Sequence, residues 1–145
     1  MKVKEIMSTP VVSIAPGESV EVASRMLARY NIGALPVCDS SKRLCGLLTD
    51  RDIVTRCLAA GRQPVRTKVR EVMTGQVVSV QPEMETGVAA HLMGKQQVRR
   101  LPVVSEGRVC GMVSLGDIAT KAEENFDAAD ALTDISQGVS DRANW

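Results

Sequence analysis

Two stretches of the 145-residue chain place a hydroxyl and a carboxylate at a spacing suited to a phosphorylated ligand: GLLTDRD at residues 46–52 and GMVSLGD at residues 111–117. Both read Gly-x-x-Thr/Ser-x-x-Asp. If each leads into a helix, the hydroxyl and the free backbone N–H groups of the first turn can bind an anion such as phosphate. The carboxylate would repel phosphate but accept hydrogen bonds from sugar hydroxyls. The pattern therefore favours a ribose phosphate over free phosphate.

The same spacing also has a purely structural interpretation. Thr49 with Asp52, and Ser114 with Asp117, stand three residues apart, as the two partners of a helix capping box do. Such a box stabilises the start of a helix with no ligand present. Spacing alone leaves both interpretations open.

The two stretches differ in charge where a phosphate would lie. Arg51 stands inside the first, whereas the second has Gly116 in that place. Farther upstream, Arg99 and Arg100 stand where the first half of the chain has Gly33 and Ala34. If the two halves face each other, these three arginines could converge on the phosphates of one nucleotide. Each could equally be a solvated surface residue.

The stretches recur because one unit is written twice. VKEIM at residues 3–7 returns as VREVM at 69–73, and the register holds for most of each copy. Hydrophobic periodicity predicts a helical lead-in, a short extended segment, a helix, a hairpin of two strands and a second helix in each copy. The predicted fold is α+β: two tandem βαββα repeats packed sheet to sheet with pseudo-two-fold symmetry, because one unit alone is too small for a good core.

The predicted boundaries follow from this repeat. The first repeat covers residues 1–61, a linker 62–68 and the second repeat 69–125; residues 126–145 form an acidic tail that is frayed or docked on a partner. The extended segments are predicted at 11–14 and 77–80, the hairpin strands at 34–38, 44–48, 101–104 and 109–113, and Ser19 as the cap of the first long helix.

Composition narrows the class of protein. Apolar residues are 44% and charged residues 24% of the chain, as in ordinary soluble proteins, and no signal peptide or membrane span is visible, so we expect a cytoplasmic protein. The net charge of +1 divides into −5 for residues 123–145 and +6 for the rest, which favours an anionic ligand or merely a solvated surface. Aromatic residues are only 2%, which argues against nucleic acid.

Metal binding and catalysis find little support. The four cysteines, Cys38, Cys45, Cys57 and Cys110, form no C-x-x-C pair, and His91 is the only histidine. Cys45 and Cys110, which stand at equivalent places in the two copies, fit small buried strand residues better than a redox role. Because no nucleophile stands with a base and no metal-ligand spacing occurs, we expect no enzyme, no metal and no required cofactor.

The doubled unit, the Leu-Pro-Val strands at 35–37 and 101–103 and the two Gly-x-x-Thr/Ser-x-x-Asp junctions resemble a CBS-domain pair, or Bateman module, over roughly residues 1–124. The resemblance implies two clefts between the copies that bind adenosine-containing ligands such as AMP, ADP, ATP or NAD. It implies that Asp52 and Asp117 bind ribose hydroxyls and that Thr49 and Ser114 lie near phosphate. The adenine contacts map to Thr9 to Val12, to Ile32 to Pro36, which includes Gly33 and Ala34, and to Val98 to Pro102, which includes Arg99 and Arg100.

The predicted function is therefore ligand sensing. The ligand would change how the copies or two chains pack and so signal to an effector protein that the sequence does not identify. We expect the cleft lined by Thr49, Arg51 and Asp52 to be the principal site. The resemblance also suggests a homodimer. The alternative is a structural dimerisation or protein-interaction module without a ligand.

Overall fold

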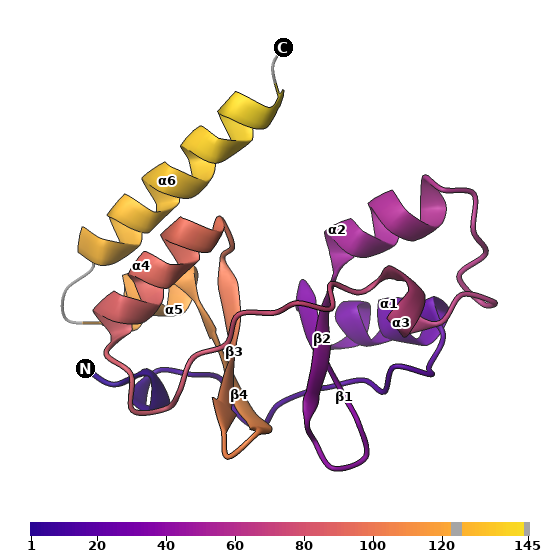
Figure 1. The fold of residues 1–145 in the computed structure, drawn as a ribbon, viewed down its shortest axis with the longest axis horizontal. Coiled ribbons are helices and arrows are strands. Elements are labelled where there is room, and N and C mark those ends of the chain that lie inside the picture. The colour runs from indigo at the N-terminus through magenta and orange to yellow at the C-terminus, as the bar shows by residue number, and fades with distance from the viewer. Residues whose placement is uncertain (123–125, 144–145) are drawn as a thin grey trace. The chain divides into compact units, whose positions relative to one another are not determined.

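The computed structural model describes residues 1–122 and 126–143, with side chains for 1–122 and 127–138. The chain divides into two compact units (Figure 1). Unit 1 comprises Met1–Val11, Val78–Ser105 and the chain from Cys110 onward. Unit 2 comprises Val12–Val77 and Glu106–Val109. Each unit mixes helices with one antiparallel hairpin, which confirms the predicted α+β class and the element order of the doubled unit.

Unit 2 is built around α1 (Val20–Tyr30) and the hairpin of β1 (Ala34–Cys38) and β2 (Leu44–Thr49). Ser19 caps α1, as predicted, because its Oγ accepts the N–H of Val22 at 3.1 Å. After β2 the chain turns directly into α2 (Asp50–Asp52), the π-helical segment η2 (Ile53–Leu58) and later α3 (Val69–Val72). The core contains apolar side chains from all of these elements: Ile14, Val20, Ala23, Leu27, Leu35, Val37, Leu48, Ile53, Cys57, Val69 and Val72.

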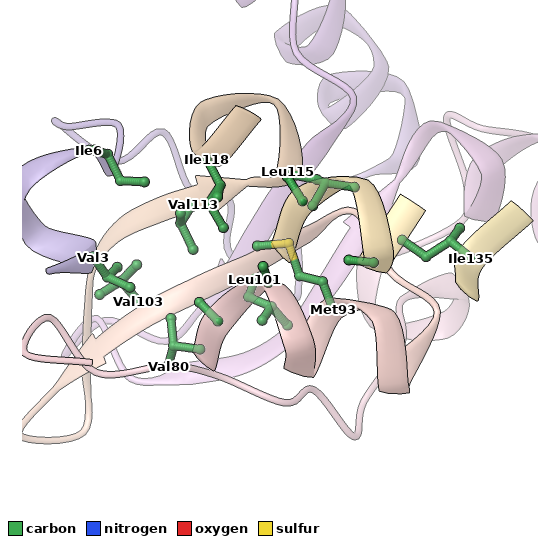
Figure 2. Packing of buried hydrophobic residues seen from close by; sticks show 14 residues of the cluster. Val3, Ile6, Val80, Met93, Leu101, Val103, Val113, Leu115, Ile118 and Ile135 are labelled. Atoms are coloured by element: carbon green, nitrogen blue, oxygen red, sulfur yellow. The ribbon is translucent and has the colours of Figure 1, made fainter. Parts of the chain in front are cut away.

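Unit 1 repeats this plan with α4 (Thr86–Gln96), β3 (Arg100–Ser105), β4 (Arg108–Ser114) and α5 (Leu115–Lys121). The N-terminal 3-10 turn η1 (Val3–Glu5) is the counterpart of α3, and α6 (Phe126–Ala143) is added. Figure 2 shows its core, where Met93 of α4 lies among Leu101, Leu115 and Ile135. One core therefore joins side chains from the first turn, the second repeat and the last helix.

The two extended segments before the long helices are shorter than predicted. Each forms a single parallel bridge, Ile14 with Val37 and Val80 with Val103, rather than a strand. In the first bridge Ile14 donates to the carbonyl of Pro36 and accepts from Cys38. The next ladder bond toward the N-terminus would need an N–H from Pro36, which proline lacks. Pro102 limits the second bridge in the same way.

The lead-in segments are exchanged between the two sequence repeats, so that each packs in the compact unit of the other repeat. Ser8, from the start of the first repeat, forms two backbone hydrogen bonds with Met112 of β4, at 2.8 and 3.2 Å. Thr74, from the start of the second repeat, forms the corresponding pair with Leu47 of β2, at 2.9 and 3.0 Å. The compact units therefore divide the chain differently from the sequence repeats.

The glycines of the two Gly-x-x-Thr/Ser-x-x-Asp stretches make this exchange sterically possible. A Cβ on Gly46 would lie 2.6 Å from the Thr74 carbonyl oxygen and 2.7 Å from the Met73 sulfur. A Cβ on Gly111 would lie 2.5 Å from the Met7 sulfur and 3.0 Å from its Cγ. All four distances are shorter than ordinary van der Waals contact. These glycines let a second chain segment lie directly against the strand.

The N-terminal segment is also held by ion pairs. Glu85 accepts from the Met1 amino group at 3.1 Å and from Lys2 Nζ at 2.7 Å. The hydrogen bond with Lys2 lowers the pKa of Glu85 and raises that of Lys2. Lys4 and Glu83 form a third pair at 2.8 Å. All of these groups are exposed, so their contribution is screened by solvent.

The two segments predicted as linker and tail are both packed. Residues 62–68 are tied to the start of α1, where Val20 and Glu21 donate to the carbonyls of Thr67 and Pro64. In place of a frayed or partner-docked tail, the structure has α6 packed on α4 of the same chain (Figure 1). Ala128, Ala131 and Ile135 are buried by this contact, because their spacing gives α6 one apolar face.

Candidate functional site

A pocket of about 760 Å³ lies in unit 1, beside the second Gly-x-x-Ser-x-x-Asp stretch. Its volume is within the range of roughly 300–1,000 Å³ that small-molecule sites occupy. Strand β3 and its approach, the β4–α5 junction and α6 supply the walls. The described residues that line it are Arg99, Arg100, Ser114, Leu115, Gly116, Ala119, Ala128, Ala129 and Leu132.

The polar end of the pocket is set by main-chain geometry. The Arg99 carbonyl accepts the N–H of Leu115 at 2.8 Å, which holds the segment before β3 against the first residue of α5. Arg100 begins β3 and Ser114 ends β4. Both arginines are exposed, so the folded protein without a ligand pays no desolvation energy for their charges. Two arginines and a serine hydroxyl lining one pocket are a combination suited to an anion.

The apolar remainder comes from two helices. Leu115 and Ala119 belong to α5, whereas Ala128, Ala129 and Leu132 belong to α6. Apolar walls with a few polar groups at one end are typical of sites that bind an organic ligand. The pocket therefore suits an amphipathic molecule with an anionic end.

Both capping boxes that the spacing allowed are formed. Thr49 Oγ1 accepts the N–H of Asp52 at 3.1 Å and Asp52 Oδ2 accepts the N–H of Thr49 at 3.0 Å. Ser114 and Asp117 make the same two bonds, each at 3.0 Å. These bonds use the hydroxyl oxygens as acceptors, so each hydroxyl still has its hydrogen to donate. The cap and the anion site are therefore compatible.

The two aspartate carboxylates have more polar partners within the protein than the two hydroxyls do. Asp117 Oδ1 lies 3.3 Å from Lys121 Nζ, and Asp52 Oδ1 lies 3.8 Å from Arg56 Nε. Asp52 is buried, with 7% of its surface exposed. Asp117 is not among the described residues that line the pocket. Each aspartate acts first as the partner of its own hydroxyl residue.

The structure brings together Arg99, Arg100 and Ser114 of the predicted site residues, and it does so in the second repeat. We expected the principal site at Thr49, Arg51 and Asp52, which belong to unit 2. There, Asp50 donates to the Gly33 carbonyl at 3.0 Å, the counterpart of the bond between Leu115 and Arg99. The backbone is thus the same in both repeats, but Gly33 brings no side chain to it.

The other predicted residues are divided between the units. Val12, Ile32, Ala34 and Pro36 are in unit 2, and Thr9 and Pro102 are in unit 1. Ala34, Pro36 and Pro102 are buried within β1 and β3, whereas Thr9 and Ile32 are exposed.

Sequence reasoning missed the part of the pocket that α6 provides. The available signal was on α4, where Gly87, Ala90 and Gly94 form a stripe of small residues. A Cβ on Gly94 would lie 3.1 Å from Ala131 Cα, closer than an ordinary contact, so glycine favours this close approach of the two helices. A stripe of small residues on α4, together with Ala128 and Ala131 on the last helix, indicates that these two helices pack closely against each other.

The cysteines and the histidine show no arrangement for chemistry. Burial raises the pKa of the Cys38 and Cys110 thiols, which keeps them protonated and poorly nucleophilic. Within residues 1–122 and 126–143, no three His, Cys, Asp or Glu side chains gather in a group that could hold a metal ion. None of the helices formed by these residues has the length and apolar character needed to span a lipid bilayer.

Comparison with known proteins identifies the family. The family model of the CBS domain matches residues 3–59 and residues 69–124, one match for each repeat. The chain belongs to the CBS domain family. The resemblance to a CBS-domain pair is thereby confirmed. This CBS pair is followed by α6, which begins after the second match ends.

Several relatives have nearly the same length. The CBS domain-containing protein YhcV of Bacillus subtilis is 41% identical over 134 residues, which cover 92% of this chain and 94% of YhcV. Hypoxic response protein 1 of Mycobacterium tuberculosis is 36% identical over 122 residues, 84% of this chain and 85% of that protein. A crystal structure of Hypoxic Response Protein I matches with a TM-score of 0.78 at 36% identity, over 83% of this chain and 98% of that one, and it contains two coordinated zinc ions.

A further solved structure carries adenosine ligands. The CBS domain pair of protein MJ0100, in complex with 5′-methylthioadenosine and S-adenosyl-L-methionine, matches with a TM-score of 0.75 and 30% identity, over 82% of this chain and 93% of that chain. CBS pairs of this shape therefore include one that binds adenosine-containing ligands.

Proposed function

We propose that this CBS pair is a non-catalytic regulatory module that binds an adenosine-containing anion in the pocket of the second repeat. The observation that carries the proposal is the pocket itself, which combines Arg99, Arg100 and Ser114 with apolar walls. The complex of MJ0100 with two adenosine compounds supports the ligand class. An adenine nucleotide has both an anionic end for the arginines and a flat, weakly polar base for the apolar walls.

The residues have separate parts in this proposal. Arg99 and Arg100 pair with phosphate oxygens, and the Ser114 hydroxyl donates to a third oxygen. Asp117 fixes the position of Ser114 through the capping box. The proposal includes two further expectations. Asp52 and Asp117 accept hydrogen bonds from ribose hydroxyls, and Thr49 and Arg51 form a second site in the first repeat.

Calorimetric titration of the full chain with AMP, ADP, ATP and NAD tests the proposal. At least one of these is expected to bind the wild-type protein. Ala129→Trp places a large side chain in the pocket and is expected to weaken binding at least tenfold. Ser136→Trp, on an exposed position of α6 outside the pocket, is the matched control and should bind as the wild type does.

Two outcomes would overturn the proposal. Binding of none of the four compounds by folded protein would favour a structural dimerisation or protein-interaction module. Unchanged binding by Ala129→Trp would move the site elsewhere. Incubation of each nucleotide with the protein followed by chromatography tests the non-catalytic part, which predicts that every nucleotide is recovered intact.

A further inference from the structure

The last helix contributes a wall of the pocket although it lies outside both CBS matches. Ala128, Ala129 and Leu132 of α6 line the pocket together with residues of the second repeat. Leu132 is 44% exposed and Ala129 is also exposed, so both are accessible to a ligand. A molecule in this pocket contacts α6 and the repeat at the same time.

The docking of α6 depends on close packing of small side chains. Ala128, Ala131 and Ile135 are its buried apolar residues, and Gly94 of α4 lies directly opposite Ala131. Among the side chains of residues 127–138, we find no ion pair or hydrogen bond to the rest of unit 1; Thr133 bonds only to the Ala129 carbonyl of its own helix. Alanine contributes little buried area, so the free energy of docking is modest.

The direction of α6 weakens the contact further. Gly87 faces Asp127, Gly94 faces Ala131 and Asp134, and Gln97 faces Gly138, so the contacts run in the same order along both helices (Figure 1). Helices α4 and α6 are therefore parallel, and their macrodipoles repel each other. An element held mainly by small apolar side chains, with no ion pair or hydrogen bond from its described side chains to the rest of the unit, and opposed by its dipole, is among the first to open locally.

We propose that α6 is the responsive element of this module, and that a ligand in the pocket holds it docked on α4. The proposal rests on the proposed function, because it takes the same pocket as the binding site. A ligand that binds only the docked state shifts the docking equilibrium by its binding free energy, and docking raises the affinity for the ligand by the same factor. Occupancy of the pocket is thereby converted into the position of an 18-residue helix.

Hydrogen exchange with mass spectrometry measures both halves of this coupling in one sample. The full chain is incubated without ligand and with 5 mM AMP, ADP or ATP. Amides of Leu115 to Asp117 report whether the pocket is occupied, and amides of residues 128–138 report whether α6 is docked. A ligand at 100 times its Kd should slow exchange of α6 about 100-fold if it binds the docked state alone.

The outcomes separate the two proposals. Slower exchange at both places, for any of the three nucleotides, is the expected result. Slower exchange at Leu115 to Asp117 with no change in α6 would overturn the coupling and leave the binding site in place. No change at either place with all three nucleotides would overturn both.

A variant that undocks α6 tests the reverse direction. Gly94→Leu places a side chain where Ala131 and Asp134 now lie, so α6 should exchange rapidly and nucleotide affinity should fall at least tenfold. Ala28→Leu is the matched control, because Ala28 is the counterpart of Gly94 in α1 and is exposed. Wild-type affinity in a Gly94→Leu protein whose α6 exchanges rapidly would contradict the coupling.

Discussion

The long helices of the two repeats show how one unit was adapted to two surroundings. Helix α1 buries one face, and its opposite face is exposed or polar, with Glu21 and Arg25 in an i,i+4 ion pair and Ala28 open to solvent. Helix α4 buries two faces, because its small residues lie under α6. The duplicated scaffold is the same, so the difference teaches that a few changes to glycine and alanine prepare a helix for an additional partner.

The same comparison distinguishes the two strand-to-helix junctions. Their backbone bonds and capping boxes agree within 0.2 Å in every hydrogen bond compared, from 3.0 and 2.8 Å at the junction to 3.0–3.1 Å in the caps. Their cations differ: the first has Arg51 and the second Arg99 and Arg100. Local geometry was conserved between the copies, whereas the charges that would face a ligand were not.

The strongest test of the shared scaffold is an added methyl group at the two motif glycines. Gly46→Ala should destabilise the protein by about 3 kcal/mol and Gly111→Ala by about 1 kcal/mol, within the usual range for overpacking. The order follows from the neighbours, because Gly46 faces a backbone carbonyl that cannot move aside and Gly111 faces the flexible side chain of Met7. Urea denaturation measures both.

Gly75→Ala is the control for this pair, since a Cβ there meets nothing within 4 Å. It should change the free energy of unfolding by less than about 0.5 kcal/mol. Equal stability of Gly46→Ala and Gly75→Ala would mean that the lead-in segments do not lie against the strands as described.

The difference in packing between α1 and α4 can be tested by a substitution at one equivalent position of each helix. Gly94→Leu should lower the free energy of unfolding by about 1 kcal/mol, because the clash with α6 outweighs the gain in helix propensity of up to ~0.8 kcal/mol. Ala28→Leu should change it by less than about 0.5 kcal/mol. Urea denaturation followed by circular dichroism reports both variants, and a larger loss in Ala28→Leu would reverse the comparison.

The smallest effect concerns the N-terminal ion pairs, which only unit 1 has. Because the pKa of Glu85 is lowered by Lys2, its stabilising effect is present above the ordinary glutamate pKa of about 4.3 and is lost as the pH falls through the lowered value. Glu85→Gln should therefore be slightly less stable than the wild type at pH 7 and equal to it near pH 3. Thermal unfolding measures the difference.

Glu18→Gln, an exposed glutamate at the start of unit 2, is the control and should match the wild type at both pH values. A Glu85→Gln deficit that persists at pH 3 would show that the side chain acts through packing and not through its charge.

Most of the scaffold could be predicted from the sequence, since the repeat, the hairpins and the Ser19 cap depend on local patterns. The length of the extended segments could not be, because the missing N–H of Pro36 and Pro102 matters only once the pairing partner is known. The exchange of lead-in segments is a tertiary contact that periodicity does not encode. The glycines at 46 and 111 carried the signal, but the ligand motif offered a competing explanation for them.

The candidate site was predicted in part. Arg99 and Arg100 were named from a difference between the copies and Ser114 from the motif that the copies share, whereas the preference for Arg51 rested on charge within one motif. The wall formed by α6 was missed because Ala128, Ala129 and Leu132 carry no polar group that would suggest a site. Their role appears only when the helix is docked.

The most direct test compares the two junctions by calorimetric titration with ATP. The double variant Arg99→Ala and Arg100→Ala should bind at least tenfold more weakly than the wild type, because each lost charge-assisted hydrogen bond costs about 1.5–3 kcal/mol. Arg51→Ala should retain the pocket of the second repeat and bind ATP there with wild-type affinity, because Arg51 is not among the residues that line it. Wild-type affinity in the double variant, with binding lost in Arg51→Ala, would contradict the assignment of the site to the second repeat.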